Sequence, residues 1–166
     1  MAFAHRGRLF AVGYRDGTVR LWDFQTEKLV KEFKEHHDLV FHLAFSSDDT
    51  LLASCSGDAV VLYDVRGGRA FPPLKDHAGK VTSVAFAPDD KTLASTSFDG
   101  TVKLWNVATR QAALTLTEHT GPVTQATFAP DGKLLAATGA DGTVRLWPAP
   151  SLQEIQNVEP ARPPQH

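Results

Sequence analysis

The sequence predicts an all-β fold built from one unit of short strands that is repeated four times. No segment of the 166-residue chain shows sustained helical periodicity. Apolar residues make up 42% and charged residues 22%, which is typical of a globular protein and not of a disordered one. Four segments align with one another with few gaps, and they cover residues 1–24, 40–65, 81–107 and 123–149.

The aromatic residue that closes each segment gives the length of the repeat. Steps of 41, 42 and 42 residues separate Trp22, Tyr63, Trp105 and Trp147. A period near 42 residues, made of short strands, predicts a β-propeller in which each repeat folds into one four-stranded antiparallel blade.

The third repeat shows how local chemistry defines the strands. Its first strand starts at Val81 and stops at Pro88-Asp89-Asp90, because such a cluster favours a turn. The Gly of Asp99-Gly100 suits the positive φ of a tight hairpin. Around these turns we expect the second, third and fourth strands over residues 91–97, 101–107 and 111–117. The fourth strands of the other repeats are predicted over residues 27–33, 69–75 and 152–158.

The third strands carry apolar residues on both sides, as in Val102, Leu104 and Trp105, so each blade is expected to be buried on both faces. Pro148 is expected to end the pairing of the last inner strand, because proline cannot donate to a ladder. The predicted blades cover approximately residues 1–35, 36–76, 77–118 and 119–158, and the Pro-rich segment 159–166 is predicted to be disordered.

Composition argues against several classes of function. The net charge is −2, with both signs mixed along the chain, so we expect no nucleic-acid partner. No apolar run is long enough to span a membrane, and we expect no membrane association. The single cysteine, Cys55, allows no intrachain disulfide, and the N-terminus lacks the apolar core of a signal peptide. We therefore expect a cytoplasmic protein.

Over residues 1 to about 158 the chain resembles the WD-repeat β-propeller family. In that family a His before the first strand, a Ser or Thr on the second, the hairpin Asp and the Trp form a buried hydrogen-bond network. The resemblance assigns this network in full to the third repeat, as His77, Ser95, Asp99 and Trp105.

The other three repeats match the pattern in part. The second has His36, Ser54, Asp58 and Tyr63, with a hairpin one residue shorter. The fourth has His119, Asp141 and Trp147, with Ala137 at the hydroxyl position, and the first has Asp16 and Trp22, with Val12 there. A pattern that recurs in degraded form indicates a structural role and not a hydrolase triad. His36, His37 and His42 lack the companions of a metal site, so neither metal nor cofactor is expected.

Propellers of this family usually contain more than four blades, and seven is common. Four blades leave two apolar faces uncovered, so we expect two chains to close an eight-bladed ring as a homodimer. The alternatives are a larger propeller completed by another polypeptide and a closed four-bladed monomer. The first strand of the first repeat is shortened, because Met1 aligns with Val84.

The predicted function is a protein–protein interaction scaffold without catalysis. The alternative is a sensor or targeting fragment of a larger multidomain protein such as a kinase. A small-molecule binder or enzyme is disfavoured, because no acid, base or metal set converges. The resemblance implies partner binding through one loop face, with the candidates Arg15, Leu39, Phe41, Lys80, Thr82, Phe98, Pro122 and Thr124. For Phe41 and Phe98, packing against neighbouring loops is an equally good interpretation.

Overall fold

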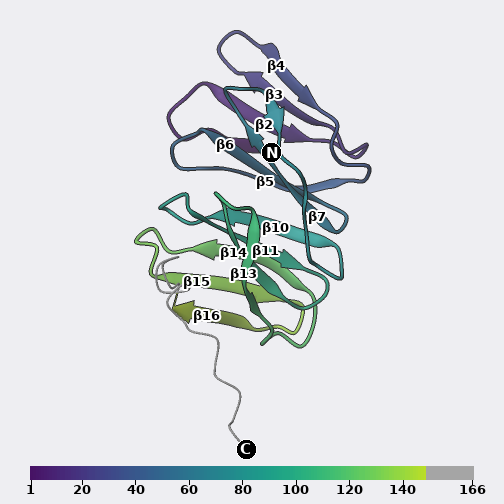
Figure 1. Cartoon of the computed structure of the whole chain (residues 1–166), viewed down its shortest axis with the longest axis vertical. Helices are drawn as coiled ribbons and strands as arrows, with labels where there is room; N and C mark the ends of the chain where they lie inside the picture. Colours follow the sequence, from purple (N-terminus) through teal and green to yellow (C-terminus); the bar gives the residue numbers. More distant parts are fainter. Residues whose placement is uncertain (149–166) are drawn as a thin grey trace, which may run out of the picture.

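The computed structural model describes residues 1–148, which form four antiparallel sheets stacked one after another along the long axis of the molecule (Figure 1). Sheet 1 contains β1 (Ala2–Phe3), β2 (Leu9–Gly13), β3 (Val19–Asp23) and β4 (Lys28–Phe33). Sheet 2 contains β5 (Val40–Phe45), β6 (Leu51–Ser56), β7 (Ala59–Asp64), β8 (Arg69–Ala70) and β9 (Leu74–Lys75). Sheet 3 contains β10 (Val81–Phe86), β11 (Thr92–Ser97), β12 (Val102–Asn106) and β13 (Gln111–Leu116). Sheet 4 contains β14 (Val123–Phe128), β15 (Leu134–Gly139) and β16 (Val144–Pro148).

The all-β class is confirmed, and the strands of each sheet are neighbours in sequence. Among the described residues, no helix is long and apolar enough to cross a membrane. The outer strand that the sequence predicts over residues 69–75 is instead two short strands, β8 and β9, which both pair with β7. Pro72 and Pro73 lie between them and have no N–H to donate to the ladder.

Two expectations concern the ends of the strip. The shortened first strand expected in the first repeat is present as the two-residue β1, which pairs with β2. Pro148 is opposite Leu134 in the last pair of β15 and β16, so the described ladder ends at this proline. The strand predicted over residues 152–158 and the tail predicted over residues 159–166 lie outside the described residues.

Each interface between neighbouring sheets joins two different kinds of face. We call the face toward the next sheet the forward face and the opposite one the rear face. The forward face of sheet 3 contributes the small and aliphatic residues Ala94, Val102 and Leu104, which pack against Leu135 and Trp147 on the rear face of sheet 4. The other two interfaces repeat this polarity, with Ala11, Val19 and Leu21 against Leu52 and Tyr63, and with Ala53, Val60 and Leu62 against Leu93 and Trp105.

The rear face of sheet 1 and the forward face of sheet 4 are covered by no other sheet of the described chain. Phe10 is paired with Trp22 on the rear face of sheet 1, where Phe3 stacks on Phe10 with ring centroids 5.6 Å apart. On the forward face of sheet 4, Val144 is 65% exposed and Leu146 is 59% exposed. Both end faces therefore expose apolar side chains that the inner sheets bury.

Two aspartates connect neighbouring sheets at the turns between first and second strands. Asp49 of sheet 2 accepts hydrogen bonds from the backbone N–H groups of His5 and Arg6, at 2.7 and 2.8 Å. Asp90 of sheet 3 accepts them from the backbone N–H and hydroxyl of Ser47 and from the N–H of the following residue. Both aspartates have positive φ values, and Gly132 is in the same place in sheet 4. Each carboxylate thus caps the turn of the preceding sheet.

Replacing Asp90 with Gly tests this contact without adding backbone strain, because glycine tolerates the positive φ. We expect Asp90→Gly to lower the free energy of unfolding by about 1 kcal/mol, since charge-assisted hydrogen bonds near the surface are lost. Urea denaturation measures the change. Asp89→Gly is the matched control, because the Asp89 carboxylate accepts only from Lys91 within its own turn. Equal losses in the two variants would contradict the role of Asp90 between the sheets.

Candidate interaction surface

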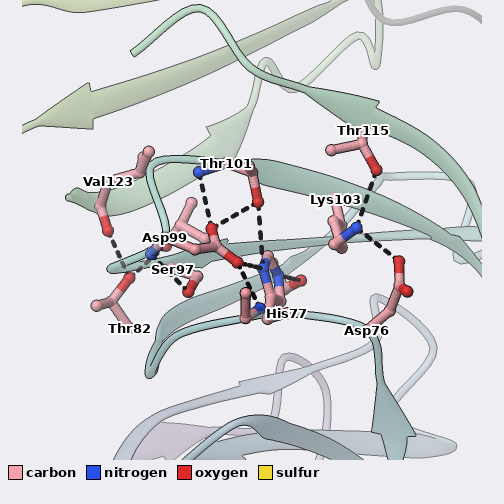
Figure 2. Close-up of polar contacts among 12 residues, drawn as sticks. Asp76, His77, Thr82, Ser97, Asp99, Thr101, Lys103, Thr115 and Val123 are labelled. Atoms are coloured by element: carbon pink, nitrogen blue, oxygen red, sulfur yellow. Dashed lines mark hydrogen bonds and ion pairs between the residues drawn. The ribbon is translucent and has the colours of Figure 1, made fainter. Parts of the chain in front are cut away.

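Sheet 3 contains an unbroken chain of hydrogen bonds from Trp105 to Asp99. The Trp105 Nε1–H donates to Ser95 Oγ at 2.8 Å, Ser95 Oγ lies 2.7 Å from His77 Nε2, and His77 Nδ1 lies 2.9 Å from Asp99 Oδ2. An indole N–H can only donate and a carboxylate can only accept. The direction is therefore fixed, with the Ser95 hydroxyl donating to His77 and the Nδ1–H of His77 donating to Asp99. Figure 2 shows His77 beside Asp99.

The surroundings of this chain set the charges of its members. Burial opposes ionisation of Asp99, but hydrogen bonds from Thr101, His77 and Ala78 outweigh it and lower the pKa of the carboxyl to about 2. Burial lowers the pKa of His77 despite the neighbouring carboxylate. At neutral pH this is thus a neutral imidazole held between a hydroxyl and a carboxylate.

In sheet 4 the chain of hydrogen bonds is interrupted at the hydroxyl position. His119 Nδ1 lies 3.0 Å from Asp141 Oδ2, as in sheet 3. Ala137 provides no hydroxyl, and the buried Nε2 of His119 has no partner within the described residues. The Trp147 Nε1–H donates instead to Glu118 at 2.9 Å. The expected network is therefore present as two separate halves.

In sheet 2 the assignment of Asp58 to the network is wrong. His36 Nε2 lies 2.6 Å from Ser54 Oγ, which lies 3.0 Å from the Tyr63 hydroxyl. The side chain of Asp58 is 63% exposed and lies 3.9 Å from Lys75 Nζ. The shorter hairpin is the reason, because only Gly57 and Asp58 separate the paired residues of β6 and β7, and the carboxylate turns outward. Burial, together with His37, lowers the pKa of His36 to about 4.

In sheet 1 the expected network is absent. The Asp16 carboxylate accepts from the backbone N–H of Thr18 at 2.9 Å, and so it caps its own hairpin. Trp22 lies half-buried on the uncovered rear face, in a hollow that it lines with Phe10, Val12 and Phe24. Val12 provides no hydroxyl, and no residue within 1–148 links Asp16 to Trp22 by hydrogen bonds.

The buried groups are poorly placed for chemistry on a substrate. Ser95 is fully buried and His77 is nearly so, and a substrate therefore cannot reach the Ser95 hydroxyl. Cys55 is also fully buried, and burial raises the pKa of its thiol to about 12. His42 points to sheet 3, with its Nδ1 3.1 Å from the carbonyl oxygen of Val84. Within residues 1–148, no three His, Cys, Asp or Glu residues are grouped as metal ligands would be.

The predicted partner-binding residues lie along the edge of the strip that carries the hairpins between second and third strands, which we call the loop face. Phe41 is 40% exposed and Phe98 is 51% exposed. The Phe98 N–H donates to the carbonyl of Lys80, whose Nζ lies 3.8 Å from Asp38. The others divide into exposed Arg15 and Thr124, and half-buried Leu39, Thr82 and Pro122.

Two of these candidates take part in hydrogen bonds within the strip. The Thr82 hydroxyl lies 2.7 Å from Thr96 Oγ1 and donates to the carbonyl of Val123, which joins sheets 3 and 4 (Figure 2). The Thr124 hydroxyl bonds to Thr138 on the neighbouring strand. Phe41 and Phe98 therefore remain as the large apolar groups of the loop face.

A second set of contacts, which the sequence predictions did not include, involves the acidic residue that directly precedes each network histidine. Asp76 pairs with Lys103 (Figure 2), and Glu118 lies 3.7 Å from Arg145. Sheet 2 has the acidic residue Glu35, but Val61 stands at the position of the basic one. The recurrence of Asp or Glu before the histidine was the signal that could have identified these pairs.

Restoring the missing hydroxyl in sheet 4 should stabilise the protein. We expect Ala137→Ser to raise the free energy of unfolding by about 0.5–1.5 kcal/mol, because the buried Nε2 of His119 gains a donor. The matched change Ser95→Ala should lower it by about 1–3 kcal/mol, because it leaves the Trp105 N–H and His77 Nε2 unpaired. Chemical denaturation measures both, and a destabilised Ala137→Ser protein would contradict the expectation.

The chain has clear relatives among known proteins. The family profile described as WD domain, G-beta repeat matches residues 71–106 and 110–148, and the profile of the anaphase-promoting complex subunit 4 WD40 domain matches residues 1–48. The WD repeat-containing protein 55 homolog of Drosophila virilis is 41% identical over 51 residues, which are 31% of this chain and 10% of that protein. Protein RBL of Arabidopsis thaliana is 34% identical over 71 residues, 41% of this chain and 13% of that protein. WD repeat-containing protein 91 of Gallus gallus is 37% identical over 57 residues, 34% of this chain and 8% of that protein. The chain thus spans about a tenth of the length of these relatives, and it belongs to the WD-repeat family.

Proposed function

We propose that the chain is a protein-interaction scaffold without catalysis, and that it binds partners through its loop face. The observation that carries this proposal is the exposure of Phe41 and Phe98 on a frame of stacked sheets, one of which contains a buried and fully paired polar network. Large exposed aromatic side chains on a rigid support provide contact area at little entropic cost. The buried histidines serve to hold the loops, which is a structural role.

Capture of binding partners by the full chain, followed by cross-linking, tests the loop face. We expect Phe41→Ala with Phe98→Ala to reduce capture of a specific cross-linked partner at least tenfold without changing the denaturation midpoint. Leu114→Ala is the matched control, because Leu114 is 36% exposed on the outer strand β13 of an inner sheet, away from the loop face and from both end faces. Loss of stability with unchanged capture would show that Phe41 and Phe98 pack against neighbouring loops instead.

We also propose that the chain associates with a second copy to close an eight-bladed ring. All three internal interfaces place a forward face against a rear face. Ala136, Val144 and Leu146 of the free forward face occupy the positions that Ala94, Val102 and Leu104 have in sheet 3. Phe10 and Trp22 of the free rear face occupy those of Leu93 and Trp105. The two end faces therefore complement each other, and two copies joined head to tail satisfy both.

Light scattering across a range of concentrations tests this association. We expect a mass twice that of the 18.1 kDa chain, and a return to the single-chain mass in Leu146→Glu, because a carboxylate at the centre of an apolar interface is left unpaired. Phe98→Ala, which changes the loop face alone, should leave the mass doubled. A single-chain mass at every concentration would contradict the ring.

A further inference from the structure

The repeated network provides two examples of how this fold binds a carboxylate. Asp99 Oδ2 lies 2.9 Å from both His77 Nδ1 and the backbone nitrogen of Ala78. Asp141 Oδ2 lies 3.0 Å from His119 Nδ1 and 3.1 Å from the backbone nitrogen of Thr120. The same pair of donors, an imidazole and the N–H of the next residue, therefore binds one carboxylate oxygen in both sheets, while Thr101 and Thr143 donate to the other oxygen.

Sheet 2 has these donors but lacks the carboxylate. His37 follows His36 just as Ala78 follows His77, so the imidazole and the next backbone N–H are both present. The Asp58 side chain, however, points toward Lys75. Neither His36 Nδ1 nor the His37 N–H has a hydrogen-bond partner among residues 1–148. A hollow of about 340 Å³ is present here, and its lining includes both histidines and Ala59.

The hydrogen bonds behind His36 orient its proton toward this hollow. Tyr63 is fully buried, and Ser54 is the partner that its hydroxyl contacts. If Tyr63 donates to Ser54 and Ser54 donates to His36 Nε2, every buried proton in the group is paired. The proton of the neutral imidazole is then on Nδ1. His36 is 94% buried, so it presents this N–H from a fixed position.

The charges around the hollow indicate that a ligand would carry a cation beside its carboxylate. Asp58 is paired with Lys75, and Asp38 is paired with Lys80 across 3.8 Å. Glu35 also lines the hollow, but Val61 replaces the basic residue that partners Asp76 and Glu118 in the later sheets. In sheet 3 Asp99 and Lys103 fill the two roles that sheet 2 leaves open (Figure 2).

We propose that the hollow of sheet 2 is a binding site for a carboxylate presented next to a cation, such as neighbouring acidic and basic side chains of a partner protein. His36 Nδ1–H and the His37 N–H hold the carboxylate, and Glu35 pairs with the cation. The hollow opens on the loop face, so the inference rests on the proposed scaffold function for the source of the ligand. The chemistry of the site is testable without any partner.

Nuclear magnetic resonance of the histidine rings in the full chain provides the test. Acetate and a blocked Asp-Lys dipeptide are the probes, and sodium chloride at equal ionic strength is the blank. We expect both probes to shift the His36 ring signals to saturation, with the dipeptide binding more tightly. His77 and His119 are internal controls, because Asp99 and Asp141 already occupy their sites. A free α-amino acid, added in a separate titration, distinguishes a small zwitterion from a peptide side-chain pair.

Glu35→Gln separates carboxylate binding by the two N–H groups from cation pairing by Glu35. Because Glu35 is exposed, the fold should tolerate the change. We expect the variant to bind acetate about two- to five-fold more tightly and to lose the preference for the dipeptide, as removal of an exposed charge predicts. Unsaturable shifts at His36, equal shifts at all three histidines, or an equal effect of sodium chloride would overturn the site. Such a result would leave the Phe41 and Phe98 capture experiment unaffected, so the two proposals fail separately.

Discussion

Burial of both faces of every inner sheet is the constraint on which the rest of this structure depends. A sheet with apolar residues on both sides is stable only between two others, so the unit of folding is the stack and not the single repeat. The internal interfaces all join an aliphatic forward face to a rear face with a large aromatic residue, as Leu104 and Trp147 do. The polarity of the stack follows from this asymmetry, and the proposed ring closure relies on the same polarity.

Polar groups hold the loops of this stack in place, and the repeats differ most where those groups are lost. Sheet 3 keeps the full chain from Trp105 to Asp99, whereas sheet 4 loses its hydroxyl and sheet 2 loses its carboxylate. A lost member leaves a buried donor or acceptor without a partner, at a cost comparable to a hydrogen bond. The loss at His119 is sealed from solvent, while the loss at His36 opens into a hollow on the loop face. The loss of one network member is therefore a defect in sheet 4 and a candidate site in sheet 2.

Much of this architecture could be predicted from the sequence because its physical causes are local. The 42-residue period, the Asp-Gly hairpins and the apolar third strands identify the four sheets without any knowledge of their packing. The complete network of sheet 3 was identified through the family resemblance, because all four residue types of the family pattern are present in that repeat. The division of the strand over residues 69–75 also has a local cause in Pro72 and Pro73, although the predicted strand ran through both prolines.

The sequence by itself determined the class of fold, the repeat and the residue types available to each network. Only the tertiary structure decided which of these residues meet. A hydrogen bond requires a side chain to point toward its partner, and shortening a hairpin by one residue turns that side chain away. Asp58 matches the pattern in type, yet the shorter turn directs its carboxylate to solvent. Trp147 likewise matches in type, but it bonds to Glu118, a partner that its own strand does not reveal. The caps from Asp49 and Asp90 join residues more than 40 positions apart, and such pairs form only after the sheets have stacked.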